Sequence, residues 1–176
     1  MAKPEGLVLV YTGNGKGKTT AALGLALRAI GHGQRVFMVQ FMKGDPSYGE
    51  IQAINKYLPT FEVVQSGKNR MMPDGSLEED KSDVVREGFF RGKEALLGGK
   101  YGLVIFDEIN IVLERGRLSV QEVLAILAAR PEHVNVVLTG RHAAKEIINF
   151  ADLVSEIREI KHPFRRGVKA QQGMEF

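Results

Sequence analysis

Five short apolar runs, each about the length of a β-strand, recur along the chain between longer stretches with a helical pattern. The runs cover residues 7–11, 35–41, 61–65, 103–108 and 134–138. Helices are predicted over residues 21–30, 48–58, 77–97, 119–130 and 143–150, and a sixth strand over residues 153–160. Continuous apolar strands between helices indicate a mostly parallel sheet that is covered on both faces. The sequence therefore predicts a three-layer α/β sandwich with about six strands, in a single domain over residues 1–176.

The polar segments of the chain follow the predicted strands. They cover residues 12–20, 40–47, 66–76, 107–110 and 139–142. The carboxyl ends of parallel strands lie at one edge of a sheet, and ligands of such folds bind at that edge. We therefore expect these segments to form the functional site.

The first polar segment has the composition of a phosphate-binding loop. Residues 12–20 read TGNGKGKTT and lie between a predicted strand and a predicted helix, which is the context that such a loop requires. Its glycines allow backbone N–H groups to approach phosphate oxygens, and the start of the helix adds its positive dipole end. Lys18 supplies a full positive charge, and the Thr19 hydroxyl is placed to bind Mg²⁺. The alternative is a glycine-rich turn that binds no ligand.

This loop is one residue shorter than the usual pattern, G-x-x-x-x-G-K-S/T. Counting back from Gly17, the first glycine of the pattern falls on Thr12, and the nearest glycine is Gly13. A shorter loop is expected to hold the phosphate chain in a different place.

Two other polar segments supply candidate partners for a nucleotide. Asp107 and Glu108 end an apolar strand, where a carboxylate can reach Mg²⁺ directly or through water. Glu108 is the candidate for a direct ligand and Asp107 for an outer-shell role; the alternative is a solvated loop start. Arg141 is expected to pair with a terminal phosphate, because a guanidinium matches phosphate oxygens, and its alternative is a surface arginine in a turn. Arg28 lies in the helix after the loop, where the alternative is a solvated helix face.

Composition narrows the kind of protein. The 176 residues include no cysteine, which excludes disulfides, thiolate metal sites and a thiol nucleophile. The net charge of +3 is spread along the chain without a basic block, so no nucleic-acid partner is predicted. The amino terminus lacks a signal-peptide pattern and no apolar run approaches the ~20 residues of a membrane span, so we expect no membrane partner and a cytoplasmic location. No nucleophile elbow is found, so the chemistry is expected to depend on a bound nucleotide and a second substrate.

Several stretches together resemble the ATP:corrinoid adenosyltransferases of the cobalamin pathway, of the cob(I)yrinic acid a,c-diamide adenosyltransferase type. They span nearly the whole chain and cover residues 11–22 (YTGNGKGKTTAA), 39–44 (VQFMKG), 103–113 (LVIFDEINIVL), 130–131, 136–141 (VVLTGR), 151–154 (ADLV) and 161–176 (KHPFRRGVKAQQGMEF). Many nucleoside triphosphatases share a phosphate-binding loop, but the short loop combined with the TGR and carboxyl-terminal sequences is specific to this family.

The resemblance implies a P-loop fold of the RecA-like kind. In this family ATP lies in the reverse direction to that in ordinary P-loop enzymes, with its terminal phosphate deep in the loop. A cob(I)alamin-type corrinoid docks beside the ribose, its Co(I) attacks the 5′-carbon of ATP, and inorganic triphosphate is released. Members are typically homodimers. Since this chain has no cysteine and no flavin motif, an external electron donor such as a flavoprotein is implied.

The resemblance also assigns roles by position. Mg²⁺ would be held by Thr19 and Glu108, with Asp107 behind them, and Asn14 would reach the ribose. The expected catalytic residues are Lys18, Thr19 and Glu108. The residues expected to bind ATP are Gly13, Asn14, Gly15, Lys16, Gly17, Lys18, Thr19, Thr20, Arg28 and Arg141.

The corrinoid contacts are expected on the loop after the third strand. Some family members place an aromatic residue there, often Trp, which pushes off the lower ligand of the corrin. This chain has no Trp and offers Met71 and Met72 instead. We expect these methionines, or Tyr48 or Phe164, to face the corrin.

The carboxyl-terminal residues 161–176 show no clear periodicity. They contain four large apolar side chains, and we therefore expect the segment to dock onto the body of the protein rather than to form a disordered tail. The four are Phe164, Val168, Met174 and Phe176.

Two other interpretations use the same nucleotide site. A P-loop kinase or ATPase would use Lys18, Thr19 and Glu108 to transfer or hydrolyse the terminal phosphate. A non-catalytic nucleotide-dependent switch would bind ATP without corrinoid-dependent turnover. The phosphate product distinguishes them, because the adenosyl transfer releases triphosphate whereas the kinase or ATPase releases ADP.

Overall fold

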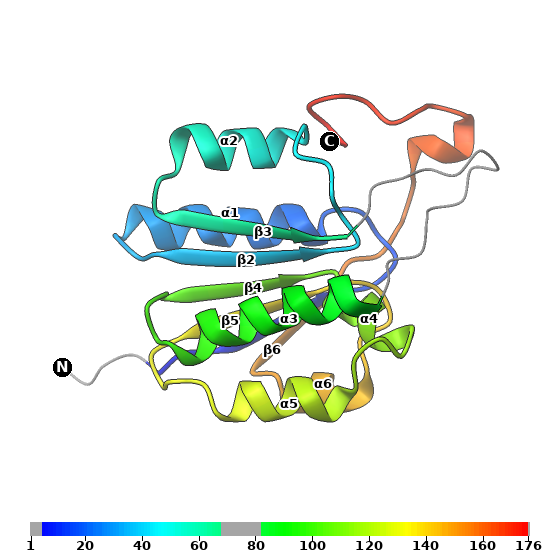
Figure 1. Cartoon of the computed structure of the whole chain (residues 1–176). Helices are drawn as coiled ribbons and strands as arrows, with labels where there is room; N and C mark the ends of the chain where they lie inside the picture. Colours follow the sequence, from blue (N-terminus) through cyan, green and yellow to red (C-terminus); the bar gives the residue numbers. More distant parts are fainter. Residues whose placement is uncertain (1–4, 68–81, 176) are drawn as a thin grey trace.

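A single six-stranded sheet forms the centre of the molecule. The computed structural model describes residues 5–67 and 82–175 (Figure 1). The strands lie in the order β3-β2-β4-β5-β1-β6, and every neighbouring pair is parallel. They are β1 (Val8–Thr12), β2 (Val36–Phe41), β3 (Phe61–Ser66), β4 (Leu103–Asp107), β5 (Asn135–Thr139) and β6 (Leu153–Glu156).

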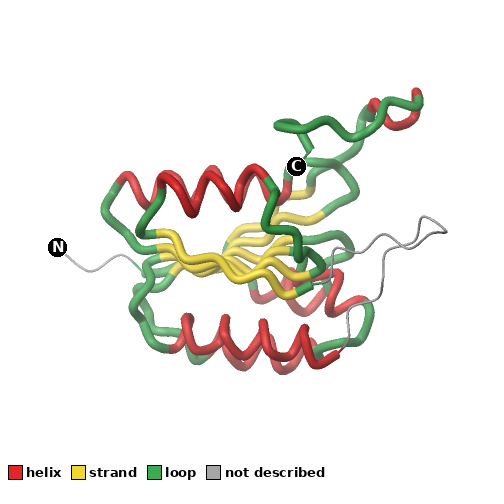
Figure 2. Tube along the Cα trace, turned by 45° about the horizontal axis from the view of Figure 1, so that its top comes forward, coloured by secondary structure: helices red, strands yellow, loops and turns green. Residues whose placement is uncertain are grey.

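Helices cover both faces of this sheet (Figures 1 and 2). One face carries α1 (Lys18–Gly31) and α2 (Gly49–Tyr57). The other carries α3 (Ser82–Leu97), the short α4 (Ile109–Glu114), α5 (Val120–Ala128) and α6 (Lys145–Phe150). This arrangement confirms the predicted three-layer α/β sandwich, and its sheet is parallel throughout. No helix of the described residues combines the length and apolarity that crossing a bilayer requires.

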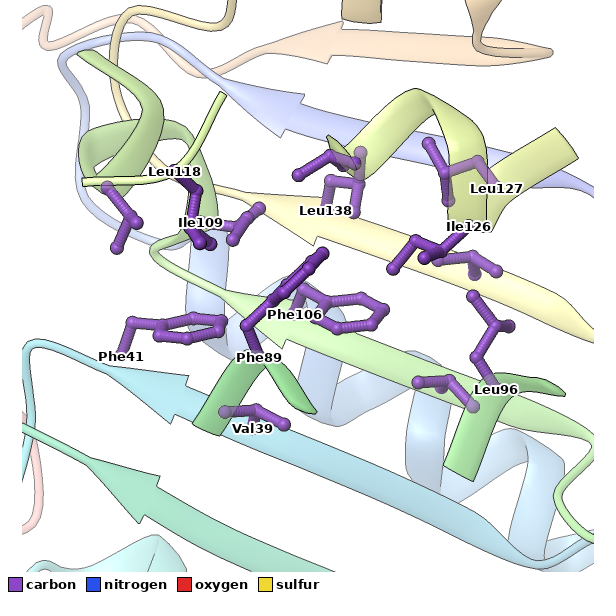
Figure 3. Close-up of a cluster of buried hydrophobic side chains, with 14 of the residues drawn as sticks. Val39, Phe41, Phe89, Leu96, Phe106, Ile109, Leu118, Ile126, Leu127 and Leu138 are labelled. Atoms are coloured by element: carbon purple, nitrogen blue, oxygen red, sulfur yellow. The ribbon is translucent and has the colours of Figure 1, made fainter. Parts of the chain in front are cut away.

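The two faces of the sheet are packed by separate apolar clusters. The larger one joins the sheet to α3 and α5, where the ring of Phe89 lies 6.4 Å from that of Phe106, measured between centroids (Figure 3). The smaller one joins the sheet to α1 and α2 through Ala22, Ala26 and Ile54. Because β2 and β4 are buried at every position, their sequences are largely apolar rather than alternating, and only Gln40 and Asp107, near the carboxyl ends, are polar. This packing fixes the positions of the carboxyl ends of the central strands and, with them, the positions of the polar residues that follow.

Two glycines of α3 allow the helix to approach the sheet closely. A Cβ atom at Gly88 would clash with the Ser66 side chain, and one at Gly92 would clash with the Phe106 ring. Gly24 of α1 differs, because a Cβ atom there would meet nothing within 4 Å. The glycines of α3 are thus required by packing, whereas Gly24 is not.

Differences between the predicted and observed elements have local causes. The first helix begins at Lys18 rather than at residue 21, after Gly17, which has a φ of 118°. β6 ends at Glu156 rather than at residue 160, because the chain then turns beside the loop that follows β1. The six-residue α4 was not predicted, since it is too short to show a helical period. Ser119 and Glu122 form a capping box at the start of α5, which begins close to the predicted residue 119. Residues 77–81 of the third predicted helix lie outside the described residues.

Residues 161–175 form a carboxyl-terminal strap. The strap includes a short 3₁₀ helix, Pro163–Arg166, and runs on the same side of the sheet as α2 to end near the start of that helix (Figure 1). It returns to the body of the protein as predicted, but not through its apolar side chains, because Phe164 is 74% and Met174 71% exposed. Its contact with the body is polar and involves Lys16. Phe176 lies outside the described residues.

The packing of α3 leads to a prediction about two Gly→Ala variants. Alanine favours a helix over glycine by about 1 kcal/mol, so Gly24→Ala should raise the free energy of unfolding by up to that amount. Gly92→Ala should instead lower it by about 1–3 kcal/mol, because the added methyl group overpacks the Phe106 ring. Urea denaturation followed by circular dichroism measures both. Equal effects of the two variants would contradict the close approach of α3.

Candidate active site

A pocket of about 520 Å³ opens at the carboxyl ends of the strands. The loop between β1 and α1 forms one side of it, and the segments after β2, β4 and β5 form its floor and opposite side. The strap closes its outer edge through Gly173, Met174 and Glu175. Four of the five polar segments that the sequence predicted to meet at this edge thus contribute to one cavity. Residues 66 and 67 of the fifth segment do not line it, and residues 68–76 lie outside the described residues.

The glycines of the phosphate loop serve two different purposes. Cβ atoms at Gly13 and Gly15 would clash with the backbone of residues 157–158, so these two are glycines because the chain after β6 packs against them. A hydrogen bond of 2.7 Å from the Gly15 N–H to the carbonyl of Ile157 uses that amide, which is therefore not available to a phosphate. Gly17 has nothing within 4 Å of its Cβ position and a φ of 118°, so it leaves the start of α1 open to the pocket.

Lys18 is buried at the base of the loop. Its ammonium donates to the carbonyl oxygens of Gly13, at 2.9 Å, and Gly15, at 2.7 Å. Burial lowers the pKa of Lys18, although the negative charge of Glu108 opposes that shift. A buried cation that is satisfied only by neutral carbonyl oxygens is poised to bind an anion.

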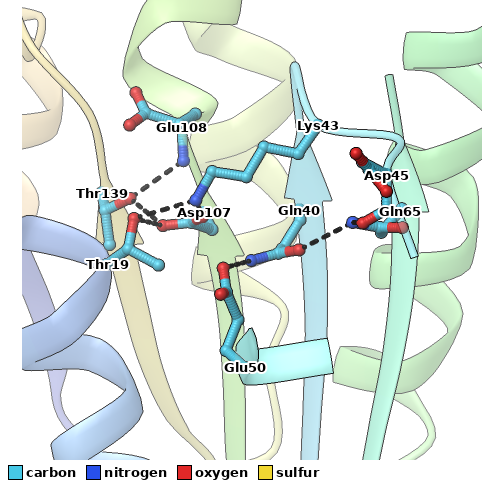
Figure 4. A network of polar contacts seen from close by, with 9 residues as sticks. All are labelled: Thr19, Gln40, Lys43, Asp45, Glu50, Gln65, Asp107, Glu108 and Thr139. Atoms are coloured by element: carbon cyan, nitrogen blue, oxygen red, sulfur yellow. Dashed lines mark hydrogen bonds and ion pairs between the residues drawn. The ribbon is translucent and has the colours of Figure 1, made fainter. Parts of the chain in front are cut away.

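Asp107 is the centre of a buried polar cluster (Figure 4). Its carboxylate is fully buried and accepts hydrogen bonds from the hydroxyls of Thr139, at 2.7 Å, and Thr19, at 2.9 Å. The ammonium of Lys43 lies 3.0 Å from its other oxygen and 3.3 Å from the Thr19 hydroxyl. The Thr139 hydroxyl also accepts from the N–H of Glu108, at 2.9 Å. One buried charge thus joins the ends of β4 and β5 to the loop after β2 and the first turn of α1.

The backbone around Lys43 is unusually constrained. Met42 has a φ of 61°, which costs a non-glycine residue on the order of 1 kcal/mol. Gly67 packs against the backbone of residues 42–43 so closely that a Cβ atom there would clash. Burial alone would lower the pKa of Lys43, but its attraction to Asp107 and their hydrogen bond outweigh burial, so this pKa is raised. The lysine is therefore held as a cation beside Asp107.

Glu108 faces the pocket from the opposite side of the cluster. It has a φ of 62°, and its carboxylate lines the cavity. Burial raises the pKa of Glu108, and the charge of Asp107 adds to that effect. A carboxylate that is costly to ionise in this state would gain from a cation in the pocket.

The residues at this edge fit a magnesium ion that is bound together with phosphates. The Lys43 ammonium already stands in as a cation between Thr19 and Asp107. The described residues contain no group of three or more His, Cys, Asp and Glu that could hold a metal ion by themselves. Mg²⁺ is usually bound by one or two carboxylates and by substrate phosphates, which agrees with such a ligand-poor site.

A second polar row extends the cluster along the strand ends. The buried Gln40 donates to Glu50 at 3.3 Å and accepts from Gln65 at 3.3 Å (Figure 4). Gln65 also donates to the carbonyl of Asp45 at 3.1 Å. This row positions Glu50, which lines the pocket beside Lys43.

Most residues predicted to bind a nucleotide lie around this pocket. Those that line it are Asn14, Gly15, Lys16, Gly17, Lys18, Thr19, Thr20, Glu108 and Arg141. Gly13 and Asp107 lie behind them, where they bond to Lys18 and Thr19.

Arg28 is not brought to the pocket. It lies near the far end of α1, about 15 Å from Lys18 along the helix axis. There it lines a separate cavity at the amino ends of β1 and β4, together with Leu9, His32 and Leu103. The expectation that it binds phosphate in this pocket is therefore corrected.

Of the residues expected to face a corrin, the two that the structure describes, Tyr48 and Phe164, do not line the pocket. Tyr48 precedes α2 and is half-buried, while Phe164 is exposed on the strap. Met71 and Met72 lie outside the described residues.

Two polar residues of the cluster, Lys43 and Thr139, were not assigned a role from the sequence. Thr139 ends an apolar strand, as Asp107 does, and Lys43 follows one closely. Thr139 also lies two residues before Arg141, which was singled out from the sequence. The feature of the sequence that could have identified them is a polar residue at the end of a buried strand. The partner of each lies in a different strand, so the sequence alone did not pair them.

The sequence matches the family described as ATP:corrinoid adenosyltransferase BtuR/CobO/CobP over residues 4–176. It is 39% identical over 172 residues to the corrinoid adenosyltransferase CobA of Salmonella typhimurium, which covers 98% of this chain and 86% of that protein. It is also 39% identical over 172 residues to the corrinoid adenosyltransferase of Escherichia coli K12, with the same coverage. The corrinoid adenosyltransferase of Pseudomonas aeruginosa is 40% identical over 175 residues, which cover 98% of this chain and 84% of that protein.

The Asp107 cluster leads to a prediction for the protein free of nucleotide and divalent metal. Lys43→Met should lower the free energy of unfolding by about 3 kcal/mol, because it leaves a fully buried carboxylate without its cation. In an Asp107→Asn background the same substitution should cost much less, since no buried charge remains. Urea denaturation in the presence of a chelator measures both. An equal cost in the two backgrounds would show that the ion pair does not hold the cluster.

Proposed function

Because the chain belongs to the ATP:corrinoid adenosyltransferase family, we propose that it transfers the 5′-deoxyadenosyl group of ATP to the Co(I) of a corrinoid. The observation that carries this proposal is the family match over residues 4–176, which includes every residue lining the pocket. The acceptor is cob(I)yrinic acid a,c-diamide, cobinamide or cobalamin, and the product serves adenosylcobalamin biosynthesis or salvage.

The reaction needs no nucleophile from the protein. The electron pair of Co(I) forms the bond to the 5′-carbon of ATP, the bond from that carbon to the phosphate oxygen breaks, and triphosphate leaves with the electron pair. Negative charge on the triphosphate therefore increases as the reaction proceeds. The task of the protein is to hold this leaving group and to align two large substrates.

The cations around the pocket fit a triphosphate. Lys18 lies at its base, bonded only to neutral carbonyl oxygens, and Arg141 lines it from the end of β5. The open start of α1 at Gly17 adds backbone N–H groups. We assign the phosphates to these groups and the ribose to the vicinity of Asn14.

Thr19 and Glu108 are the residues that we propose to hold Mg²⁺, with Asp107 behind them. Thr19 and Glu108 both line the pocket, whereas Asp107 does not, and its oxygens are already bonded to Thr19, Thr139 and Lys43. When bound, the ion would neutralise part of the charge on the triphosphate. The protein's own contribution is to hold the Thr19 hydroxyl in place through Asp107.

Three further proposals follow from membership of the family. The protein works as a homodimer in the cytoplasm, and an external donor such as a flavoprotein reduces the corrinoid. The chain itself contains no cysteine that could carry electrons. Met71, Met72, Tyr48 and Phe164 remain the proposed corrin contacts.

The rival kinase or ATPase activity is not favoured, because the relatives that match nearly the whole chain are named as corrinoid adenosyltransferases. The two activities differ in their phosphate products. Incubation with ATP, Mg²⁺ and chemically reduced cobalamin should yield triphosphate in proportion to adenosylated corrinoid. Release of ADP independently of corrinoid would overturn the proposal.

Replacement of Lys18 tests the role of the phosphate loop. Lys18→Ala should reduce triphosphate release by at least about a hundredfold, because it removes a preorganised donor to the charge that develops on the leaving group. The variant should remain folded, since the buried ammonium contacts only loop carbonyls. Lys93→Ala, on the exposed side of α3 and on the other face of the sheet, is the matched control and should keep full activity. Retained turnover in Lys18→Ala would disprove the assignment.

A further inference from the structure

The tip of the strap is tied to the phosphate loop through one lysine. The ammonium of Lys16 donates to the carbonyl oxygen of Met174 at 2.7 Å and forms an ion pair of 2.6 Å with the carboxylate of Glu175. These contacts join the phosphate loop to the far end of the chain, and Lys16 and Met174 are 158 positions apart. Both groups are partly shielded, since the side chain of Lys16 is 42% exposed and that of Glu175 26%.

The tip itself has a defined shape. The N–H groups of Met174 and Glu175 both donate to the carbonyl of Gln171, at 3.1 and 2.8 Å, and Gly173 has a φ of 78°. This turn points the carbonyl of Met174 and the carboxylate of Glu175 at Lys16. Since Phe164 and Met174 are mostly exposed, burial of apolar side chains contributes little to holding the strap in place.

The closed strap leaves the phosphate site free. With Gly173, Met174 and Glu175 in position, the pocket still encloses about 520 Å³, which is within the usual range for small-molecule sites. The ammonium of Lys18 bonds to loop carbonyls and not to the strap. A segment that blocked the site would be expected to bond to this ammonium. The strap therefore borders the pocket and does not fill it.

We propose that the strap is the outer wall of the nucleotide pocket and that Glu175, acting through Lys16, is the positioning residue that keeps it closed over the phosphates. The inference rests on the proposed function to the extent that ATP occupies this pocket. It assigns Lys16 to the strap, rather than to direct phosphate binding as expected from the sequence. When the strap is closed, it shields the phosphates of the bound ATP from water and slows the dissociation of ATP.

The binding of ATP with Mg²⁺, measured by isothermal titration calorimetry, tests this role. Glu175→Gln should weaken binding by about fivefold, because the pocket is complete for a smaller fraction of the time. Lys16→Met should weaken it by a similar factor, and the double variant should be no weaker than either single variant. A lysine that bound phosphate directly would instead lose affinity in the Glu175→Gln background as well.

Arg86→Met is the matched control. Arg86 forms an ion pair of 3.2 Å with Glu122 between α3 and α5, on the other face of the sheet. Its loss should leave the affinity for ATP unchanged.

Limited trypsin digestion reports on the strap itself. Arg165, Arg166 and Lys169 are exposed cleavage sites within it. ATP should slow cleavage at these sites in the wild-type protein and protect them less in Glu175→Gln.

The outcomes separate the two proposals. Unchanged or tighter binding of ATP by Glu175→Gln, in the presence of normal binding by the wild-type protein, would overturn the strap's role and leave the proposed function intact. A wild-type protein that did not bind ATP would overturn both.

Discussion

The buried carboxylate of Asp107 is the constraint on which the site depends. An ionised group with no exposed surface must be compensated by neighbouring donors, and this one takes them from Thr19, Thr139 and Lys43. These three come from α1, β5 and the loop after β2, so satisfying one charge draws separate parts of the chain together. Three partners on two oxygens fix the rotamer of each, and the Thr19 hydroxyl reaches the pocket already oriented.

The sequence revealed the fold and the phosphate loop because both are recorded locally. Continuous apolar runs mark strands buried on both faces, and the glycine-rich loop stands directly between a strand and a helix. The roles of Lys43 and Thr139 escaped because their common partner, Asp107, lies on another strand. Arg28 was expected near the phosphates, but ten residues of helix separate it from Lys18, and it therefore lines a different cavity.

The short phosphate loop takes its shape from a distant part of the chain. Gly13 and Gly15 pack against residues 157–158, and the Gly15 amide bonds to Ile157. Only Gly17 is open on the side of the pocket. The glycines of the loop therefore have different roles. Gly13 and Gly15 accommodate neighbouring protein backbone, and Gly17 leaves room for a ligand. The same carboxyl-terminal region braces the loop from beneath at residues 157–158 and covers it from outside at Glu175.

The position of β1 between β5 and β6 has a consequence for how the molecule is made. β1 precedes β5 and β6 in the chain, so both of its edges can be paired only after these two strands have been synthesised. Domains tend to fold as units, and contacts between distant residues form slowly. The loop that follows β1 acquires its brace only when residue 157 has been synthesised. A nascent chain that is released early would thus contain the whole phosphate-loop sequence and still lack a working loop.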